Sequence, residues 1–126
     1  MKLRPVRTRV EVLDGEEVRA WLSPDSGFSR EDREKHLKRV AHVCNLLARN
    51  GVAVIAAFVS PYRSLRDFAR RSVGRFVEVY VRCSLGTCMK RDSKGLYVKA
   101  LRGEIRDMTG IRRLCQALRI CMVTLA

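Results

Sequence analysis

Residues 52–59 form an unbroken run of apolar side chains, several of them β-branched, with turn-forming residues on both sides. A strand that lacks alternating polar residues is buried on both faces, as in a parallel sheet that helices cover. Shorter strand-like stretches occur at residues 10–13 and 76–81, and stretches of helical period separate the three. Strands that alternate with helices predict an α/β fold of three layers, with a parallel sheet in the middle and helices flanking it.

The longest helix is predicted after Ser29, which has the side chain of an N-cap and is followed by two acidic residues in the first turn. Apolar residues at helical spacing continue from Leu37 to Leu47, and Gly51 is a typical C-terminal stop. Such helices supply the crossovers that parallel strands need. Shorter helices are expected at residues 16–22, from residue 60 to about 72, at 85–91 and at 94–102.

The composition is strongly basic, because 26 Lys and Arg stand against 13 Asp and Glu and give a net charge of +13. Such a chain attracts nucleic acid, an anionic membrane surface or small phosphate and sulfate esters; the alternative is a solvated basic surface. The basic residues are scattered, and no helix-turn-helix, zinc-finger or RNA-recognition pattern occurs. Nucleic acid is therefore disfavoured as a partner. No run approaches the roughly 18 apolar residues of a membrane span, so no membrane partner is expected.

The five cysteines include no C-x-x-C pair, and together with two histidines they show no zinc-ligand spacing. The first residues alternate in charge and lack the apolar core of a secretory signal. We therefore expect reduced thiols, a cytoplasmic protein and no metal held by the chain's own residues.

Ligands of parallel α/β sheets bind beyond the carboxyl ends of the strands. These ends lie at residues 14–19, at 60–63 and in the stretch after 81. Asp14 and Glu16 follow directly on the first strand and are the candidate carboxylates for proton transfer. The alternative is an ordinary solvated turn.

Five segments extend this pattern, in order and with natural spacing. They read LDGEEVR (13–19), GFSREDR (27–33), AFVSPYR (57–63), RDSKGLYVKA (91–100) and GEI (103–105) with TGI (109–111). In this combination the sequence resembles the adenylylsulfate kinases of sulfate assimilation. The resemblance implies a P-loop kinase fold that transfers the γ-phosphoryl group of ATP to the ribose 3′-hydroxyl of adenosine 5′-phosphosulfate. It also implies magnesium bound with the ATP.

The resemblance assigns catalytic positions to Asp14, Glu16 and Ser60, with Ser60 at the place of a phosphoserine intermediate. Direct in-line transfer needs no such intermediate, and Ser60 followed by Pro61 also has the pattern of a helix N-cap. Both interpretations of Ser60 are compatible. The family usually has Asp where this chain has Glu16, and the longer side chain moves the carboxylate by about one ångström.

The resemblance further implies that Arg19 and Arg33 contact the phosphosulfate, for which a guanidinium group is suited. It places Phe28 against the substrate adenine. Two positions depart from the family, which typically has Asn in place of His36 and Phe in place of Met108. The remaining implied substrate-binding residues are His36, Pro61, Tyr62, Lys94, Tyr97, Lys99 and Met108.

The two ends of the sequence depart from the family more strongly. The family begins with a strand and a G-x-x-x-x-G-K-[ST] loop that holds the ATP phosphates, whereas thirteen residues without glycine precede Asp14. After residue 111 the sequence becomes basic and keeps helical period to residue 125. We therefore expect an incomplete sheet that lacks the first, P-loop strand and the last strand. The expected organisation is a partial kinase domain at 1–111 and a divergent basic amphipathic tail, helical, at 112–126. Alternatively, the apolar stripe of this tail covers the gap in the sheet.

Two functions remain open from the sequence. One is an adenylylsulfate kinase chain whose beginning is missing or wrongly assigned. The other is a non-catalytic remnant that binds adenosine phosphosulfate, forms a homodimer or pairs with a complete kinase subunit. In both cases we expect at most weak binding of the phosphosulfate and no specific binding of Mg-ATP by these 126 residues.

Overall fold

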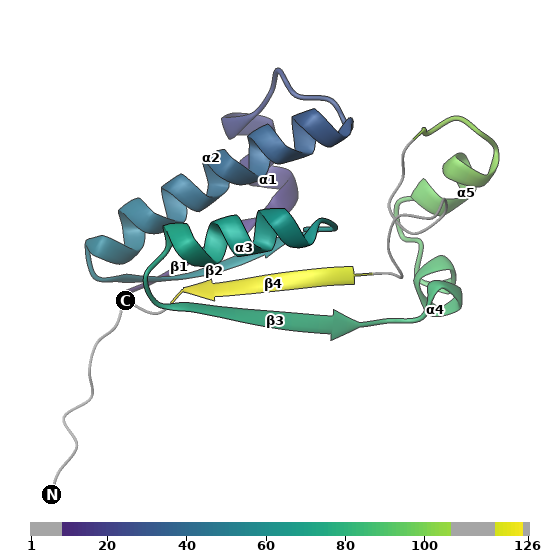
Figure 1. The fold of residues 1–126 in the computed structure, drawn as a ribbon. Helices are drawn as coiled ribbons and strands as arrows, with labels where there is room; N and C mark the ends of the chain where they lie inside the picture. Colours follow the sequence, from purple (N-terminus) through teal and green to yellow (C-terminus); the bar gives the residue numbers. More distant parts are fainter. Residues whose placement is uncertain (1–8, 107–117, 125–126) are drawn as a thin grey trace, which may run out of the picture.

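The computed structural model describes residues 9–106 and 118–124 (Figure 1). The α/β class predicted from the sequence is confirmed, and the predicted strands and helices before residue 103 all occur. Their bounds, in chain order, are β1 (Arg9–Asp14), α1 (Gly15–Leu22), α2 (Arg30–Arg49), β2 (Val52–Phe58), α3 (Arg63–Ser72), β3 (Phe76–Arg82), α4 (Leu85–Lys90), α5 (Leu96–Leu101) and β4 (Leu118–Thr124).

The four strands form one sheet in the order β1-β2-β4-β3 (Figure 1). Strand β1 is parallel to β2, with Asp14 opposite Ala57. Strand β4 is antiparallel to both of its neighbours, so β1, β2 and β3 all run in the same direction. The sheet is therefore mixed, where the sequence predicts a parallel one.

Strand β4 corrects two expectations about the end of the chain. Residues 118–124 form this strand and not the predicted helix, so a strand does follow the kinase-like part. Strands β2 and β3 lie one strand apart, and the edges that face this gap present N–H and C=O groups that need partners. A strand in the gap satisfies both edges, which outweighs the helical period of the sequence. The expectation that the tail covers the gap is thus confirmed, with a strand as the cover; residues 112–117 lie outside the described residues.

The start of α3 also differs from the prediction. The sequence predicts Ser60 as the N-cap and Pro61 as the first helical residue, but the helix begins at Arg63 and has no side-chain cap. Ser60 is buried, and its carbonyl accepts a hydrogen bond of 3.0 Å from Arg66 Nη1. This hydrogen bond ties Ser60 to the start of α3, although residues 60–62 are not part of the helix.

Helix α2 has the predicted ends. The Ser29 hydroxyl accepts a hydrogen bond of 3.1 Å from the backbone N–H of Asp32, which satisfies one of the free amides of the first turn. At the other end Gly51 takes the left-handed conformation, with φ of 79°, that a residue with a side chain adopts only at a cost. These two residues set the length of the helix that covers β2.

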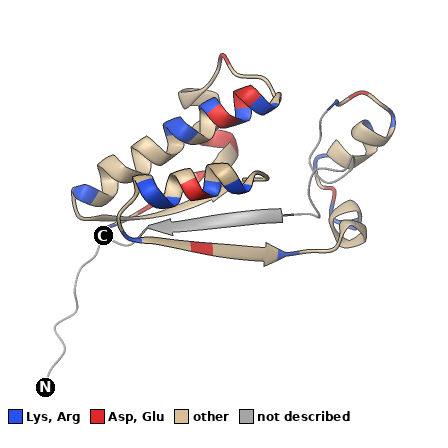
Figure 2. Cartoon of the chain, viewed as in Figure 1, with Lys and Arg blue, Asp and Glu red and all other residues tan. Residues whose placement is uncertain are grey.

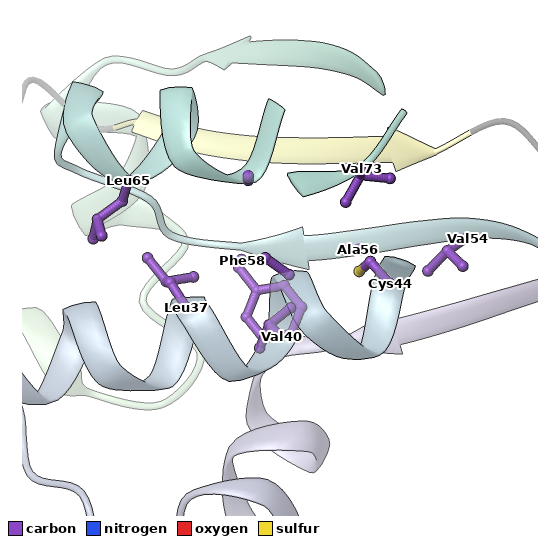
Figure 3. Packing of buried hydrophobic residues seen from close by; sticks show 10 residues of the cluster. Leu37, Val40, Cys44, Val54, Ala56, Phe58, Leu65 and Val73 are labelled. Atoms are coloured by element: carbon purple, nitrogen blue, oxygen red, sulfur yellow. The ribbon is translucent and has the colours of Figure 1, made fainter. Parts of the chain in front are cut away.

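The core lies between β2 and the helices α2 and α3 (Figure 3). Leu13 of β1 and Val18 of α1 pack against its edge, so α1 lies on the same side of the sheet. The described residues thus form two of the three predicted layers, with helices on one face (Figure 1). Within these residues no helix is both long and apolar enough to cross a bilayer. The buried apolar side chains are Leu37, Val40, Ala41, Cys44, Val54, Ala56, Phe58, Leu65, Ala69 and Val73.

Removal of β4 should destabilise the whole sheet. A chain that ends at residue 117 leaves β2 and β3 without their shared partner, and we expect it to lose at least about 3 kcal/mol of unfolding free energy. Urea unfolding followed by circular dichroism measures the loss. The matched control lacks only residues 125–126 and should change by less than about 0.5 kcal/mol. Equal unfolding midpoints for the two truncated chains would contradict the role of β4.

Candidate functional site

Asp14 ends β1 and caps α1. Its Oδ1 accepts hydrogen bonds from the backbone N–H groups of Glu16 (3.0 Å) and Glu17 (3.4 Å). Gly15, between them, lies so close to β2 that a Cβ atom would stand 2.9 Å from the carbonyl oxygen of Ala57. A glycine is therefore required, and the close approach holds both candidate carboxylates at the carboxyl end of the parallel strands.

Glu16 forms an ion pair with Lys94, although the two residues lie far apart in the sequence. Lys94 belongs to the α4–α5 lobe, which we define as residues 84–103 and which extends beyond the sheet in Figure 1. Asp92 fixes the turn before α5, because its carboxylate accepts from the backbone N–H groups of Leu96 (2.8 Å), Tyr97 (3.0 Å) and Val98 (3.2 Å). Both partners of the ion pair therefore stand at the start of a capped helix.

Phe28 is flanked by two arginines. The guanidinium carbon of Arg19 lies 4.5 Å from the ring centroid, and that of Arg33 lies 5.8 Å from it. Arg19 also donates to the carbonyls of Ser26 and Gly27, and Arg33 Nε donates to the Phe28 carbonyl at 2.9 Å. Phe28 is 60% exposed. An exposed aromatic face between two fixed cations is suited to a planar base that carries an oxyanion.

The loop that carries Phe28 is tied to α2 by Arg39, a residue that sequence reasoning missed. Its guanidinium donates to the Leu22 carbonyl (3.0 Å), to Ser23 Oγ (3.1 Å) and to Asp25 Oδ1 (2.9 Å). Lys35 pairs with the same carboxylate at 2.9 Å. Hydrogen bonds from Arg39 and then Lys35 hold the pKa of Asp25 well below its usual range. No sequence pattern links an acid in a loop to a base two turns into the following helix.

His36 is buried beneath this loop. Its Nδ1 lies 2.8 Å from Ser23 Oγ, and its ring centroid lies 5.7 Å from that of Phe58. The other ring nitrogen, Nε2, is buried without a hydrogen-bond partner among the described residues. Burial, reinforced by the positive charges of Arg19 and Arg39, lowers the pKa of His36 to about 4. The imidazole is therefore neutral at physiological pH.

The other predicted site residues are more dispersed. Ser60 is 2% exposed and its Oγ has no hydrogen-bond partner in the part of the chain that the structure describes, so a phosphoryl donor in solvent does not reach it without rearrangement. Pro61 and the ring of Tyr62 lie partly buried after β2, with the Arg30 guanidinium 4.7 Å from the Tyr62 ring centroid. Tyr97 is partly buried and Lys99 is exposed on α5, and Met108 lies outside the described residues.

The site does not fit a bound Mg-ATP. Among residues 9–106 and 118–124 no three His, Cys, Asp or Glu side chains gather as metal ligands. None of the 126 residues belongs to a G-x-x-x-x-G-K-[ST] sequence that would hold ATP phosphates.

Comparison with known proteins identifies the family. A family model described as Adenylylsulphate kinase matches residues 1–124, a range that includes β4. The chain belongs to the adenylylsulphate kinase family. Relatives agree with this assignment: a probable adenylyl-sulfate kinase of Pyrococcus abyssi is 51% identical over 86% of this chain and 63% of its own length. The adenylyl-sulfate kinase of Rippkaea orientalis is 51% identical over 87% of this chain and 61% of its own length.

A solved structure supports the fold of this adenylylsulphate kinase family member. The APS kinase CysC of Mycobacterium tuberculosis, in complex with AMPPNP and APS, superposes with a TM-score of 0.73 at 35% identity. The superposition covers 86% of this chain and 65% of that one. The chain thus spans about three-fifths of the length of the curated relatives described above, and somewhat more of the solved kinase.

The neutral, buried His36 predicts a specific pH dependence of stability. In the folded state the His36 imidazole becomes protonated only near pH 4, whereas in the unfolded chain it becomes protonated near pH 6.5. Its contribution to the stability is therefore fully present above pH 6.5 and is lost as the pH falls toward 4, by roughly 3 kcal/mol. In His36→Asn we expect the fall in unfolding free energy over this range to be smaller by that amount. Urea unfolding at a series of pH values measures it.

His42 supplies the control, because it is exposed on the same helix. His42→Asn should keep the pH dependence of the original chain. If both variants show the same pH dependence as the original chain, His36 is not the group responsible.

The ion pair between Lys94 and Glu16 predicts a link between the lobe and the sheet. Lys94→Gln should accelerate amide hydrogen exchange in α5 by about two- to five-fold, the range expected for loss of an exposed ion pair. Lys90→Gln is the control, because Lys90 forms no ion pair among the described residues. The double variant Glu16→Lys with Lys94→Glu should restore slow exchange, and a failure to restore it would argue against the pairing.

Proposed function

We propose that this chain binds the acceptor substrate of the adenylylsulfate kinase reaction, adenosine 5′-phosphosulfate. The observation that carries the proposal is the exposed ring of Phe28 between Arg19 and Arg33. The ring offers a face for adenine, and the two guanidinium groups offer charge-assisted hydrogen bonds to the phosphosulfate. The related M. tuberculosis enzyme was solved with APS and AMPPNP, which agrees with a site of this kind.

The reaction that we propose for this site is phosphoryl transfer to the ribose 3′-hydroxyl. Asp14 and Glu16 are the candidate groups to orient this hydroxyl and accept its proton. Asp14 is held by the start of α1, and Glu16 is held by Lys94. The ion pair must open, or Lys94 must turn to the substrate, before Glu16 contacts the acceptor.

The donor side of the reaction needs residues that this sequence does not supply. We propose that the 126-residue chain binds Mg-ATP no better than an unrelated basic protein, and that it transfers phosphate only together with a complete kinase subunit. Without such a subunit it acts as a binding protein for adenosine phosphosulfate. We also propose a cytoplasmic location, in agreement with the free thiols of Cys44 and Cys88.

Calorimetric titration with adenosine phosphosulfate tests the proposal. We expect weak binding that falls about ten-fold or more in Arg33→Gln and in Phe28→Ala, because each variant removes one recognition group. AMP, which lacks the sulfate, should bind more weakly than the phosphosulfate. Arg71→Gln, an exposed arginine on α3, is the control and should leave affinity unchanged.

Two outcomes would contradict this assignment. One is phosphosulfate binding that does not change in Arg33→Gln and Phe28→Ala. The other is tight, magnesium-dependent binding of ATP by the chain alone, which would show that another part of it replaces the phosphate-binding loop.

A further inference from the structure

The chain between β2 and α3 lies at the same edge of the sheet as the candidate carboxylates. In the register of the two parallel strands Asp14 stands opposite Ala57, so residues 59–62 begin two positions beyond it. We call residues 59–62 the acceptor segment, because the site residues predicted between β2 and α3 all lie in it. The segment belongs to neither the strand nor the helix, and Tyr62 forms no side-chain cap of α3. Its position therefore depends on contacts with neighbouring elements.

Arg66 of α3 connects the acceptor segment to strand β3. Its Nη1 donates a hydrogen bond of 3.0 Å to the Ser60 carbonyl, and its Nε lies 2.9 Å from Glu78 Oε1. The side chains of Arg66 and Glu78 are only 18% and 23% exposed, so water competes little for these groups. The guanidinium group holds its donors in a fixed plane, and a carboxylate on one edge therefore sets the direction of the other donors. The position of the Ser60 carbonyl thus follows from that of Glu78.

Glu78 is itself positioned by the sheet. It lies in β3, opposite Met122 of β4, and β4 separates β3 from β2. In Figure 2 it is the single acidic band on β3, which runs below α3 and its basic residues in this view. The acceptor segment therefore depends, through Arg66 and Glu78, on two strands that lie on the far side of β2 from Asp14.

A second arginine provides an internal comparison. Arg70, one turn further along α3, pairs with the other oxygen of Glu78 at 2.5 Å, and its side chain is 56% exposed. Among the described residues this side chain makes no contact with the acceptor segment. Both arginines thus hold the same carboxylate, but of the two only Arg66 also holds the segment.

We propose that Arg66 is a positioning residue for the acceptor substrate. Its hydrogen bond keeps the acceptor segment in one arrangement before the ligand arrives, so binding does not have to order this segment. The inference rests on the proposed function and adds to it a residue that acts through Ser60 and not on the ligand. A lysine at this position keeps the charge, but its ammonium group lacks the planar fork that fixes the two acceptors relative to one another.

Calorimetric titration of the 126-residue chain with adenosine phosphosulfate tests the proposal. Arg66→Lys should weaken binding about three- to ten-fold, the range expected for one lost hydrogen bond. Arg70→Lys is the matched control, because it changes the other partner of Glu78, and it should leave the affinity unchanged. Urea unfolding followed by circular dichroism shows that each variant is folded under the conditions of the titration.

Glu78→Gln gives a second test that leaves Arg66 in place. It removes the charge that orients the guanidinium group and should also weaken binding. If Arg66 acts through this carboxylate, the double variant Glu78→Gln with Arg66→Lys should bind no more weakly than Arg66→Lys alone, whereas independent effects would multiply. Amide hydrogen exchange at Leu65, whose N–H donates to the Tyr62 carbonyl at 3.1 Å, should accelerate in Arg66→Lys and not in Arg70→Lys.

Equal affinities of the original chain and Arg66→Lys, together with weaker binding in Phe28→Ala, would overturn the positioning role and leave the proposed function intact. Equal losses of affinity in Arg66→Lys and Arg70→Lys would also overturn it, since the shared ion pair with Glu78 would then act on stability alone. If the original chain binds no phosphosulfate, the proposed function fails and this inference fails with it.

Discussion

Three side chains of β2, Val54, Ala56 and Phe58, pack beneath α2 and α3, while β1 and β4 pair with the two edges of the same strand. A strand that is covered on one face and paired on both edges has almost no freedom to slip, because a shift by one residue would turn its apolar set to the wrong side. Gly15 packs closely against the backbone of this strand at Ala57, so the position of β2 also fixes where α1 begins. The core and the candidate site therefore depend on one packing arrangement.

The basic residues serve the fold as much as the site. Arg66 and Arg70 hold Glu78 of β3 against α3, and Arg39 holds the loop before α2. These contacts use hydrogen bonds to carbonyl and carboxylate oxygens, for which the guanidinium group has five donors in a fixed plane. Only some of the positive charge is thus available to a ligand. Net charge alone would have favoured nucleic acid as readily as a small phosphosulfate ester.

The sequence predicted best what local patterns determine. The unbroken apolar run gives β2, and the cap at Ser29 with the stop at Gly51 gives α2 almost to the residue. Strand β4 escaped prediction because the edges that it satisfies are some forty and sixty residues away, and its own pattern is equally that of a helix. For the site, the family segments pointed to Phe28 and its two arginines, which lie together. The bond network of Arg39 could not be foreseen, since it arises only when the loop folds back on the helix.

The hydrogen bonds of Arg39 and its neighbours affect the entropy of ligand binding. Arg39 and Lys35 hold Asp25, and Arg19 and Arg33 hold the carbonyls around Phe28, before any ligand is present. A surface loop would otherwise lose conformational entropy on binding, at about 1 kcal/mol or more for each residue that becomes ordered. Here that entropy has already been given up during folding. Association should therefore resemble entry into a rigid, formed surface, with few rotamers left to freeze in the protein itself.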